Sequence, residues 1–112
     1  MISVSSEMND IILLTLKGKL VSSDDVEEMY LTIKDVISKD HKKIILDLKN
    51  VNWISSLGIG SLMRSLTTVK NSGGDLRLAS VSQKIKKIFS ITKLDNVFQL
   101  YGNLDEAIKS FN

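Results

Sequence analysis

Short, nearly continuous runs of apolar residues recur along the chain and predict its strands. Ile11–Leu16 and Ile44–Leu48 contain few polar positions, which is typical of strands covered on both faces of a sheet. Asn9–Asp10 comes directly before the first of these runs, and so short a connection favours an antiparallel pair with the strand ahead of it. The expected strands, of which the last is a short edge strand, are Ile2 to Val4, Ile11–Leu16, Ile44–Leu48, Leu76–Ala79 and Val97–Tyr101.

Apolar residues at helical spacing predict four helices between and after these strands. Ser22 to Asp25 open the first helix, because hydroxyl and carboxylate oxygens stabilise the free N–H groups of a helix start. Asn71–Gly74 end the second helix, Ser82 caps the third, and Asn103 with Glu106 resembles a capping box for the fourth. The expected buried faces are Val26, Met29, Tyr30, Ile33 and Ile37; Ile59, Leu62, Met63, Leu66 and Val69; Ile85, Ile88 and Phe89; and Leu104, Ala107, Ile108 and Phe111.

The order of these elements predicts an α/β fold. Two strand–helix–strand units follow one another, which implies parallel neighbouring strands joined by right-handed crossovers. Gly18 breaks the pattern of the second strand, and a loop through Val51, Trp53 and Ile54 follows the third. With 112 residues and no proline, residues 1–112 are expected to form one domain, a small mixed sheet of about four or five strands with about four helices packed against it.

Composition narrows the possible classes of function. The longest apolar runs are too short to span a bilayer, and the first residues lack the basic start and apolar core of a signal peptide. The absence of cysteine fits a cytoplasmic protein and excludes a thiol nucleophile. A formal net charge of +2 is too small to indicate direct binding of nucleic acid. We therefore expect a cytoplasmic protein without membrane insertion.

A serine turn, Ser55–Ser56, lies between a predicted strand and a predicted helix. Serines at a helix start accept hydrogen bonds from the first free N–H groups, and the same groups bind anions with the help of the helix dipole. One interpretation is that the serines only cap the helix; our hypothesis is that one of them carries a phosphate. If the turn is exposed, Leu57 and Ile59 form an apolar lip where a phosphate would oppose binding of a partner.

Residues that support catalysis are sparse. His41, the only histidine, falls in a predicted loop without a second metal ligand, and a Ser56 nucleophile would lack a base. Asp47, at a predicted strand end, is interpreted as a capping or solvated carboxylate. Gly58–Gly60 completes neither a dinucleotide-binding fingerprint nor a P-loop. We expect no catalytic residue, no metal and no cofactor.

Two features remain open to a binding role. Lys84, Lys86 and Lys87 form a basic cluster on the third helix, interpreted as a solvated face, with contact to lipid headgroups, RNA or an acidic partner as the alternative. Trp53 is interpreted as a core or rim residue that flanks the serine turn and is able to anchor a partner.

The central segment resembles a known family. From Asp47 to Leu62 the chain reads DLKNVNWISSLGIGSL, which is similar to the hallmark D-L-x-x-V-x-F/Y-I/M-D-S-S/T-G-L-G-x-L of the STAS-domain family, the bacterial anti-sigma factor antagonists. The likeness continues through Gly73–Leu78, Val81–Ser82, Phe89, Thr92 to Leu94 and Val97–Phe98.

The resemblance implies a binding module and not an enzyme. In the family, the unphosphorylated protein captures an anti-sigma factor that is also a serine kinase, and a sigma factor is released. The kinase uses ATP to phosphorylate the serine after the motif's aspartate, which ejects the antagonist, and a metal-dependent serine phosphatase resets the cycle. The phosphorylated serine maps to Ser56. The residues expected to bind the partner are Ser55, Leu57, Gly58, Ile59, Trp53, Ser22 and Ser23.

Three positions depart from the family pattern. Ser55 replaces the motif's aspartate, Leu57 replaces the Ser/Thr after the acceptor, and Gly18 to Val21 lacks both acids of the family's Gly-Glu-Leu/Ile-Asp segment. These departures leave an alternative open, in which the domain is a constitutive adaptor subunit of a larger complex, such as a stress-signalling scaffold or a lipid-transport assembly.

Overall fold

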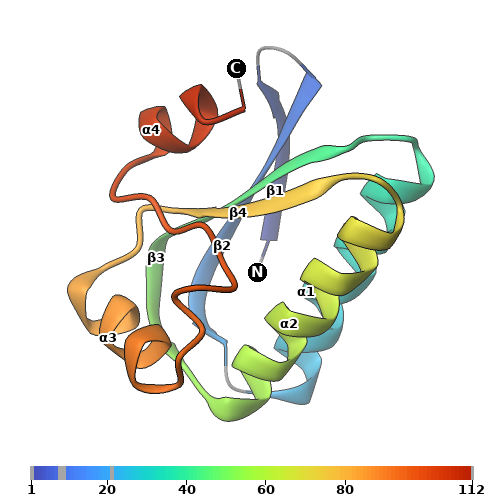
Figure 1. Ribbon diagram of the computed structural model, residues 1–112. Coiled ribbons are helices and arrows are strands. Elements are labelled where there is room, and N and C mark those ends of the chain that lie inside the picture. Colours follow the sequence, from blue (N-terminus) through green and yellow to red (C-terminus); the bar gives the residue numbers. More distant parts are fainter. Residues whose placement is uncertain (1, 8–9, 21, 112) are drawn as a thin grey trace.

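A computed structural model describes residues 2–7, 10–20 and 22–111 of the chain (Figure 1). Apolar runs form its strands and amphipathic segments form its helices, as the sequence predicts. The elements are β1 (Ile2–Glu7), β2 (Ile11–Leu20), α1 (Ser23–Ser38), β3 (Lys43–Ile54), α2 (Ser56–Asn71), β4 (Asp75–Ala79), α3 (Gln83–Ile91) and α4 (Leu104–Lys109).

The strands form one mixed sheet in the order β1-β2-β3-β4. β1 pairs antiparallel with β2, whereas β2–β3 and β3–β4 are parallel pairs. These pairings confirm the predicted antiparallel start and the two parallel strand–helix–strand units. Of the predicted turn at Asn9–Asp10, only Asp10 lies within the described residues.

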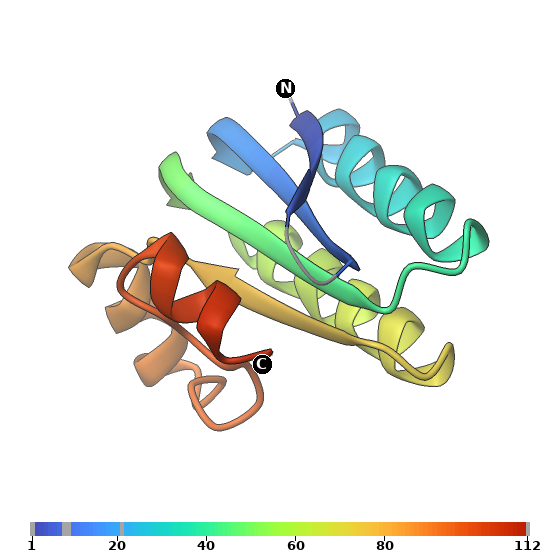
Figure 2. The ribbon, with the colours of Figure 1, turned by 90° about the horizontal axis from the view of Figure 1, so that it is seen from above.

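The sheet separates two hydrophobic clusters. Helices α1 and α2 cover one face of the sheet and α4 lies over the other (Figure 2). The larger cluster packs under α1 and α2 and includes Leu14, Ile33, Leu46, Leu62 and Phe89, all of which are fully buried. The smaller cluster contains Ile11, Leu13, Ile45, Ala79 and Ala107, with Leu104, Ile108 and Phe111 of the α4 region packed against it. The predicted inner face of α4 is thereby confirmed.

The predicted loop through Val51, Trp53 and Ile54 is wrong, because β3 continues to Ile54. The prediction failed because Lys49, Asn50 and Asn52 are exposed and interrupt the apolar run. β2 also continues past Gly18, which adopts a φ of +96° next to a register shift of the β2–β3 ladder. A left-handed glycine allows such a bulge without ending the strand. The extension carries β3 directly into the serine turn.

The predicted edge strand Val97–Tyr101 is also wrong. The segment makes a single parallel bridge, between Leu78 and Leu100, and Val97 is exposed. Backbone bonds from Leu78 N–H to Gln99 O and from Tyr101 N–H to Leu78 O nevertheless hold this segment beside β4. Phe98 packs on Phe89 of α3 with ring centroids 5.5 Å apart, so the segment is fixed by side-chain packing more than by a ladder.

The helix starts follow the predicted capping chemistry. Ser22, Ser55, Ser82 and Asn103 each accept a hydrogen bond from the backbone N–H three residues ahead. A side-chain acceptor at this position satisfies one of the free donors of a helix start. The starts of α1 and α2 lie at the same end of the sheet, together with α3 (Figure 1).

Candidate functional site

The two serines of the turn occupy different positions in helix α2. Ser55 is the N-cap: its backbone is extended, and its Oγ accepts a hydrogen bond from the Gly58 N–H at 3.2 Å. Ser56 is the first helical residue, and its side chain is exposed. The capping role predicted as one interpretation of the turn therefore falls to Ser55, and Ser56 is the serine with a hydroxyl open to a modifying enzyme.

The backbone around Ser56 favours negative charge. The N–H groups of Ser56 and Leu57 donate to no acceptor among the residues that the structure describes. The first turn of α2 contains no acidic residue. Free N–H donors and the positive end of a sixteen-residue helix together stabilise an anion at this place.

Large apolar side chains flank Ser56. Leu57 is 48% exposed and Trp53 is 41% exposed, so both are available to a partner. Ile59 is half-buried and packs against the core beneath α2, and Gly58 is buried. Leu57 thus forms the outer part of the predicted apolar lip and Ile59 its inner part, while a role for Gly58 in partner binding stays a prediction.

Ser22 and Ser23 lie at the start of α1, and the starts of α1 and α2 are at the same end of the sheet (Figure 1). Both are exposed, and Ser22 Oγ accepts a hydrogen bond from the Asp25 N–H at 3.1 Å as the N-cap of α1. One turn further along, the carbonyl oxygen of Val26 accepts a hydrogen bond from Ser61 Oγ at 3.3 Å. This bond joins α1 to α2 within about two turns of their starts, and a role for Ser22 and Ser23 in partner binding stays a prediction.

Trp53 and Lys84 form a contact that the sequence did not predict. Lys84 Nζ lies 4.9 Å from the centroid of the Trp53 ring, within the range of a cation–π interaction. Trp53 comes from the end of β3 and Lys84 from the first turn of α3. Since residues 31 positions apart in the chain share no periodicity, no local pattern identifies the pair. Trp53 is confirmed as a rim residue.

Asp47 lies within β3 and not at its end, which corrects its predicted position. Its side chain is 8% exposed, and its Oδ1 accepts a hydrogen bond from the Lys49 N–H at 3.0 Å. The residue borders a cavity of about 480 Å³ with Ser80, Ser82 and Asn103. Because Ser82 and Asn103 already cap α3 and α4, the polar atoms around this cavity serve mainly the fold.

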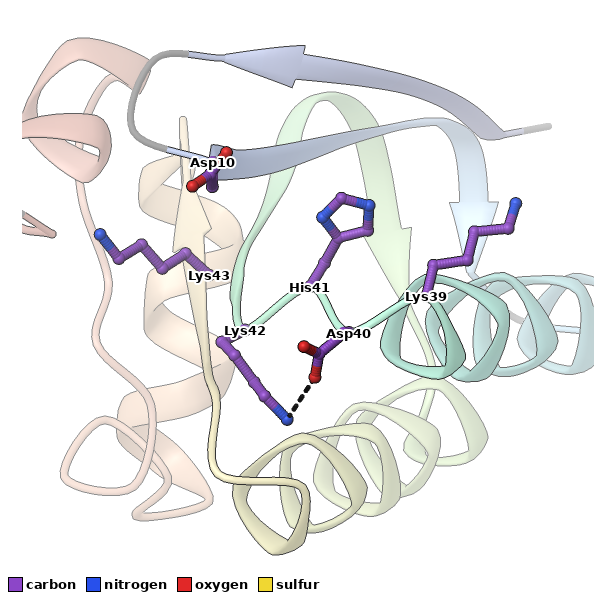
Figure 3. A pocket seen from close by; sticks show the side chains of 6 residues that line it. All are labelled: Asp10, Lys39, Asp40, His41, Lys42 and Lys43. Atoms are coloured by element: carbon purple, nitrogen blue, oxygen red, sulfur yellow. Dashed lines mark ion pairs between the residues drawn. The ribbon is translucent and has the colours of Figure 1, made fainter.

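His41 borders a second cavity, of about 410 Å³, with Asp10, Lys39, Asp40, Lys42 and Lys43. Figure 3 shows that these side chains point in different directions and do not converge on one point. Lys42 pairs with Asp40 at 3.4 Å, and Lys39 pairs with Asp35 at 3.1 Å. The cavity therefore offers no assembled catalytic or anion-binding set.

Within the described ranges, no group of three or more His, Cys, Asp and Glu side chains is placed to hold a metal ion. Among those same residues, no helix combines the length and the apolar character that a membrane span requires. The serine turn, with its apolar rim, is the candidate functional site.

Comparison with known proteins agrees with the resemblance seen in the sequence. The family model of the STAS domain matches residues 4–107. A Thermotoga maritima protein named for a proposed role as an anti-sigma factor antagonist is 31% identical over 75 residues, which are 67% of this chain and 66% of that protein. The matched region thus spans just under two thirds of the relative's length.

Solved structures share the fold. The crystal structure of tm1081 from Thermotoga maritima matches with a TM-score of 0.87 at 24% identity, over 97% of this chain and 92% of that one. The phosphorylated form of the Bacillus cell fate determinant SpoIIAA matches with a TM-score of 0.76 at 18% identity, over 100% of both chains.

Proposed function

The chain belongs to the STAS-domain family, and we propose that it is a phosphorylation-switched binding module of the anti-sigma factor antagonist type. With Ser56 unmodified, it binds an anti-sigma factor that is also a serine kinase, and a sigma factor is thereby released. The single observation that carries this proposal is the exposure of Ser56 at the first position of α2, while Ser55 does the capping.

The switching step is a phosphoryl transfer from ATP to Ser56. A bond forms between Ser56 Oγ and the γ-phosphorus, and the bond from that phosphorus to the bridging oxygen of ADP breaks. The hydroxyl proton passes to a base of the kinase. This chain supplies the acceptor and its position, and a metal-dependent serine phosphatase removes the phosphate by hydrolysis. The relative solved in a phosphorylated form supports a phosphate on this fold.

The free protein is expected to tolerate the phosphate. A phosphoserine carries roughly −1.5 to −2 charges at neutral pH. At the first position of α2 it meets the dipole's positive end and the N–H groups of Ser56 and Leu57, for which the described part of the chain provides no acceptor. The Ser55 cap is expected to persist, because its Oγ accepts the Gly58 N–H and this bond does not involve the side chain of Ser56.

Phosphorylation of Ser56 is expected to weaken binding of the protein partner. Leu57 and Trp53 offer apolar surface to the partner on either side of Ser56 in the chain. A phosphate placed between them must be desolvated when the partner docks, which costs free energy unless the partner supplies compensating donors. Phosphorylation therefore changes affinity through local charge and needs no refolding of the domain.

Affinity capture from the native host tests this function. Wild type and Ser56→Ala are expected to retain a protein that phosphorylates wild type on Ser56 when ATP is added, whereas Ser56→Asp is expected to release it. Ser55→Asp is the matched control, since it places a carboxylate one residue away at a favoured capping position. If wild type and the three variants all retain the same partner equally, and that partner has no kinase activity, the result would support the constitutive adaptor instead.

A further inference from the structure

Helix α3 has its charges at the unfavourable end. Its sequence QKIKKIFSI places Lys84, Lys86 and Lys87 in the first half, and it contains no acidic residue. The first turns of α1 and α4, by contrast, contain Asp24 with Asp25 and Asp105 with Glu106. Because the N-terminal end of a helix is positive, cations there destabilise it. A local arrangement that opposes the helix dipole is expected where a surface serves binding.

The lysines of α3 differ in their ion pairing from lysines elsewhere in the molecule. Lys39, Lys42 and Lys70 each pair with an aspartate elsewhere in the molecule. Among the described residues, none of the three α3 lysines forms such a pair, and all three are exposed. Their charge is therefore available to an external anion.

Two of the lysines belong to one face of α3 together with apolar groups. Lys84, Lys87 and Ile91 are spaced three and four residues apart, so they lie on one side of the helix. Ile91 is 70% exposed, and Lys84 covers the Trp53 ring at 4.9 Å. Lys86 belongs to a different side, where it borders a small cavity with Tyr101 and Gly102. We call Trp53, Lys84, Lys87 and Ile91 the α3 surface.

We propose that the α3 surface docks an acidic and apolar segment of the protein partner, with carboxylates on Lys84 and Lys87 and apolar side chains on Trp53 and Ile91. The proposal rests on the proposed function, because it identifies the chemistry of the partner bound beside Ser56. Exposed apolar groups interleaved with two lysines favour a protein over RNA, for which a track of aromatic side chains is expected. The phosphate is expected to have a second effect, because its negative charge, three residues after Trp53 in the chain, opposes the approach of the same carboxylates.

The test uses two synthetic amphipathic peptides that differ only in charge. One carries Glu and Leu on one face of a helix, and its twin carries Lys in place of every Glu. The Glu peptide is expected to shift the backbone amide resonances of α3 and to change the fluorescence of Trp53, the only tryptophan of the chain. The Lys peptide is expected to do neither, and binding of the Glu peptide is expected to weaken as salt is added.

Two double variants separate the effect of the α3 surface from the effect of the protein's net charge. Lys84→Glu/Lys87→Glu is expected to weaken binding of the Glu peptide by about tenfold. Lys86→Glu/Lys109→Glu makes the same change in net charge and is expected to leave the affinity within about twofold, because both side chains lie off the α3 surface. The melting temperatures of the two double variants, compared with that of wild type, show whether each variant is folded. A folded variant thus reports on binding alone.

Three results would overturn the proposal. They are equal weakening by the two double variants, no response of α3 to the Glu peptide, and binding of anionic lipid vesicles or single-stranded RNA through α3 in place of the Glu peptide. A failure here leaves the proposed function standing if Ser56 is phosphorylated in the native host. Conversely, peptide binding at α3 by a protein whose Ser56 is never phosphorylated in the native host would refute the switch and retain the surface.

Discussion

Ser55 Oγ accepts a hydrogen bond from the Gly58 N–H at 3.2 Å, while the neighbouring Ser56 is exposed and its side chain takes no part in that bond. From the sequence, either serine could cap the helix or carry a phosphate, and the structure separates the two roles. Ser55 starts the helix, and Ser56 presents a hydroxyl on it. The division explains how a phosphate can be added at this turn without removing the cap that holds α2.

Substitution of the two serines should affect stability unequally. Ser55→Ala removes the cap of α2 and is expected to lower the free energy of unfolding by about 1 kcal/mol. Ser56→Ala removes an exposed hydroxyl and is expected to stay within about 0.5 kcal/mol of wild type. Urea denaturation followed by circular dichroism measures both. A larger loss for Ser56→Ala than for Ser55→Ala would contradict the assignment of the cap.

A negative charge at position 56 should not destabilise the free protein. Ser56→Asp places a carboxylate in the first turn of α2, where the dipole is expected to stabilise it by about 0.3–1 kcal/mol at low salt. The matched substitution Asn71→Asp lies in the last turn of the same helix and should be unfavourable by a similar amount. Thermal unfolding at low and high salt measures the effect, which should shrink as salt is added. Destabilisation by Ser56→Asp of the same size as by Asn71→Asp would speak against an anion-binding helix start at Ser56.

Ser65 on α2 should be replaceable with a gain in stability. Its side chain is fully buried, and its Oγ has no hydrogen-bond partner among the described residues. Ser65→Ala removes an unsatisfied hydroxyl and improves helix propensity, so the free energy of unfolding is expected to rise by about 1 kcal/mol. Ser61→Ala is the control, because Ser61 Oγ donates to Val26 O at 3.3 Å and its loss should bring no gain. A drop in stability for Ser65→Ala would show that the hydroxyl is satisfied.

Asp75 at the start of β4 should make stability depend on acid pH. Burial acts to raise the pKa of Asp75, but hydrogen bonds from Lys70 and Arg77 outweigh it and hold the pKa below its usual value. A depressed pKa in the folded state stabilises the fold above the unfolded pKa of about 3.9, and this contribution is lost as pH falls through the folded value.

Asp75→Asn is therefore expected to lower the free energy of unfolding by about 1 kcal/mol at neutral pH. This value is kept small because Asp75 and its partner Lys70 are partly exposed to solvent. The difference from wild type should disappear at strongly acidic pH. Asp95→Asn, at an exposed site in the loop after α3, is the control and should change little at either pH. A difference that grows as the pH falls would refute the sign of this pKa shift.

Local patterns predicted most of the fold, because most elements here are stabilised by their own periodicity and caps. The exceptions involve contacts between distant residues. β3 extends to Ile54 only because β2 continues past the Gly18 bulge and pairs Gly18 with Val51 and Leu20 with Ile54. Val97–Tyr101 has strand-like composition, but it meets β4 at one bridge only.

The candidate site was predicted at Ser55–Ser56 from helix-start chemistry, and the structure decides which serine is the cap. The contact of Lys84 with Trp53 was not predictable, since it depends on how α3 packs beside the end of β3. From the sequence alone, the lysines of α3 were interpreted as a solvated face. Their exposure is confirmed, and their relation to the aromatic ring required the tertiary structure.

Phosphosite mapping of the protein from its native host, before and after incubation of the extract with ATP, reports on the proposed switch itself. We expect phosphate on Ser56 that increases with ATP, is absent from Ser56→Ala and persists in Ser55→Ala. Phosphate on Ser55 in place of Ser56, or a Ser56 hydroxyl that stays unmodified after ATP is added to an extract that contains the partner, would refute the switch.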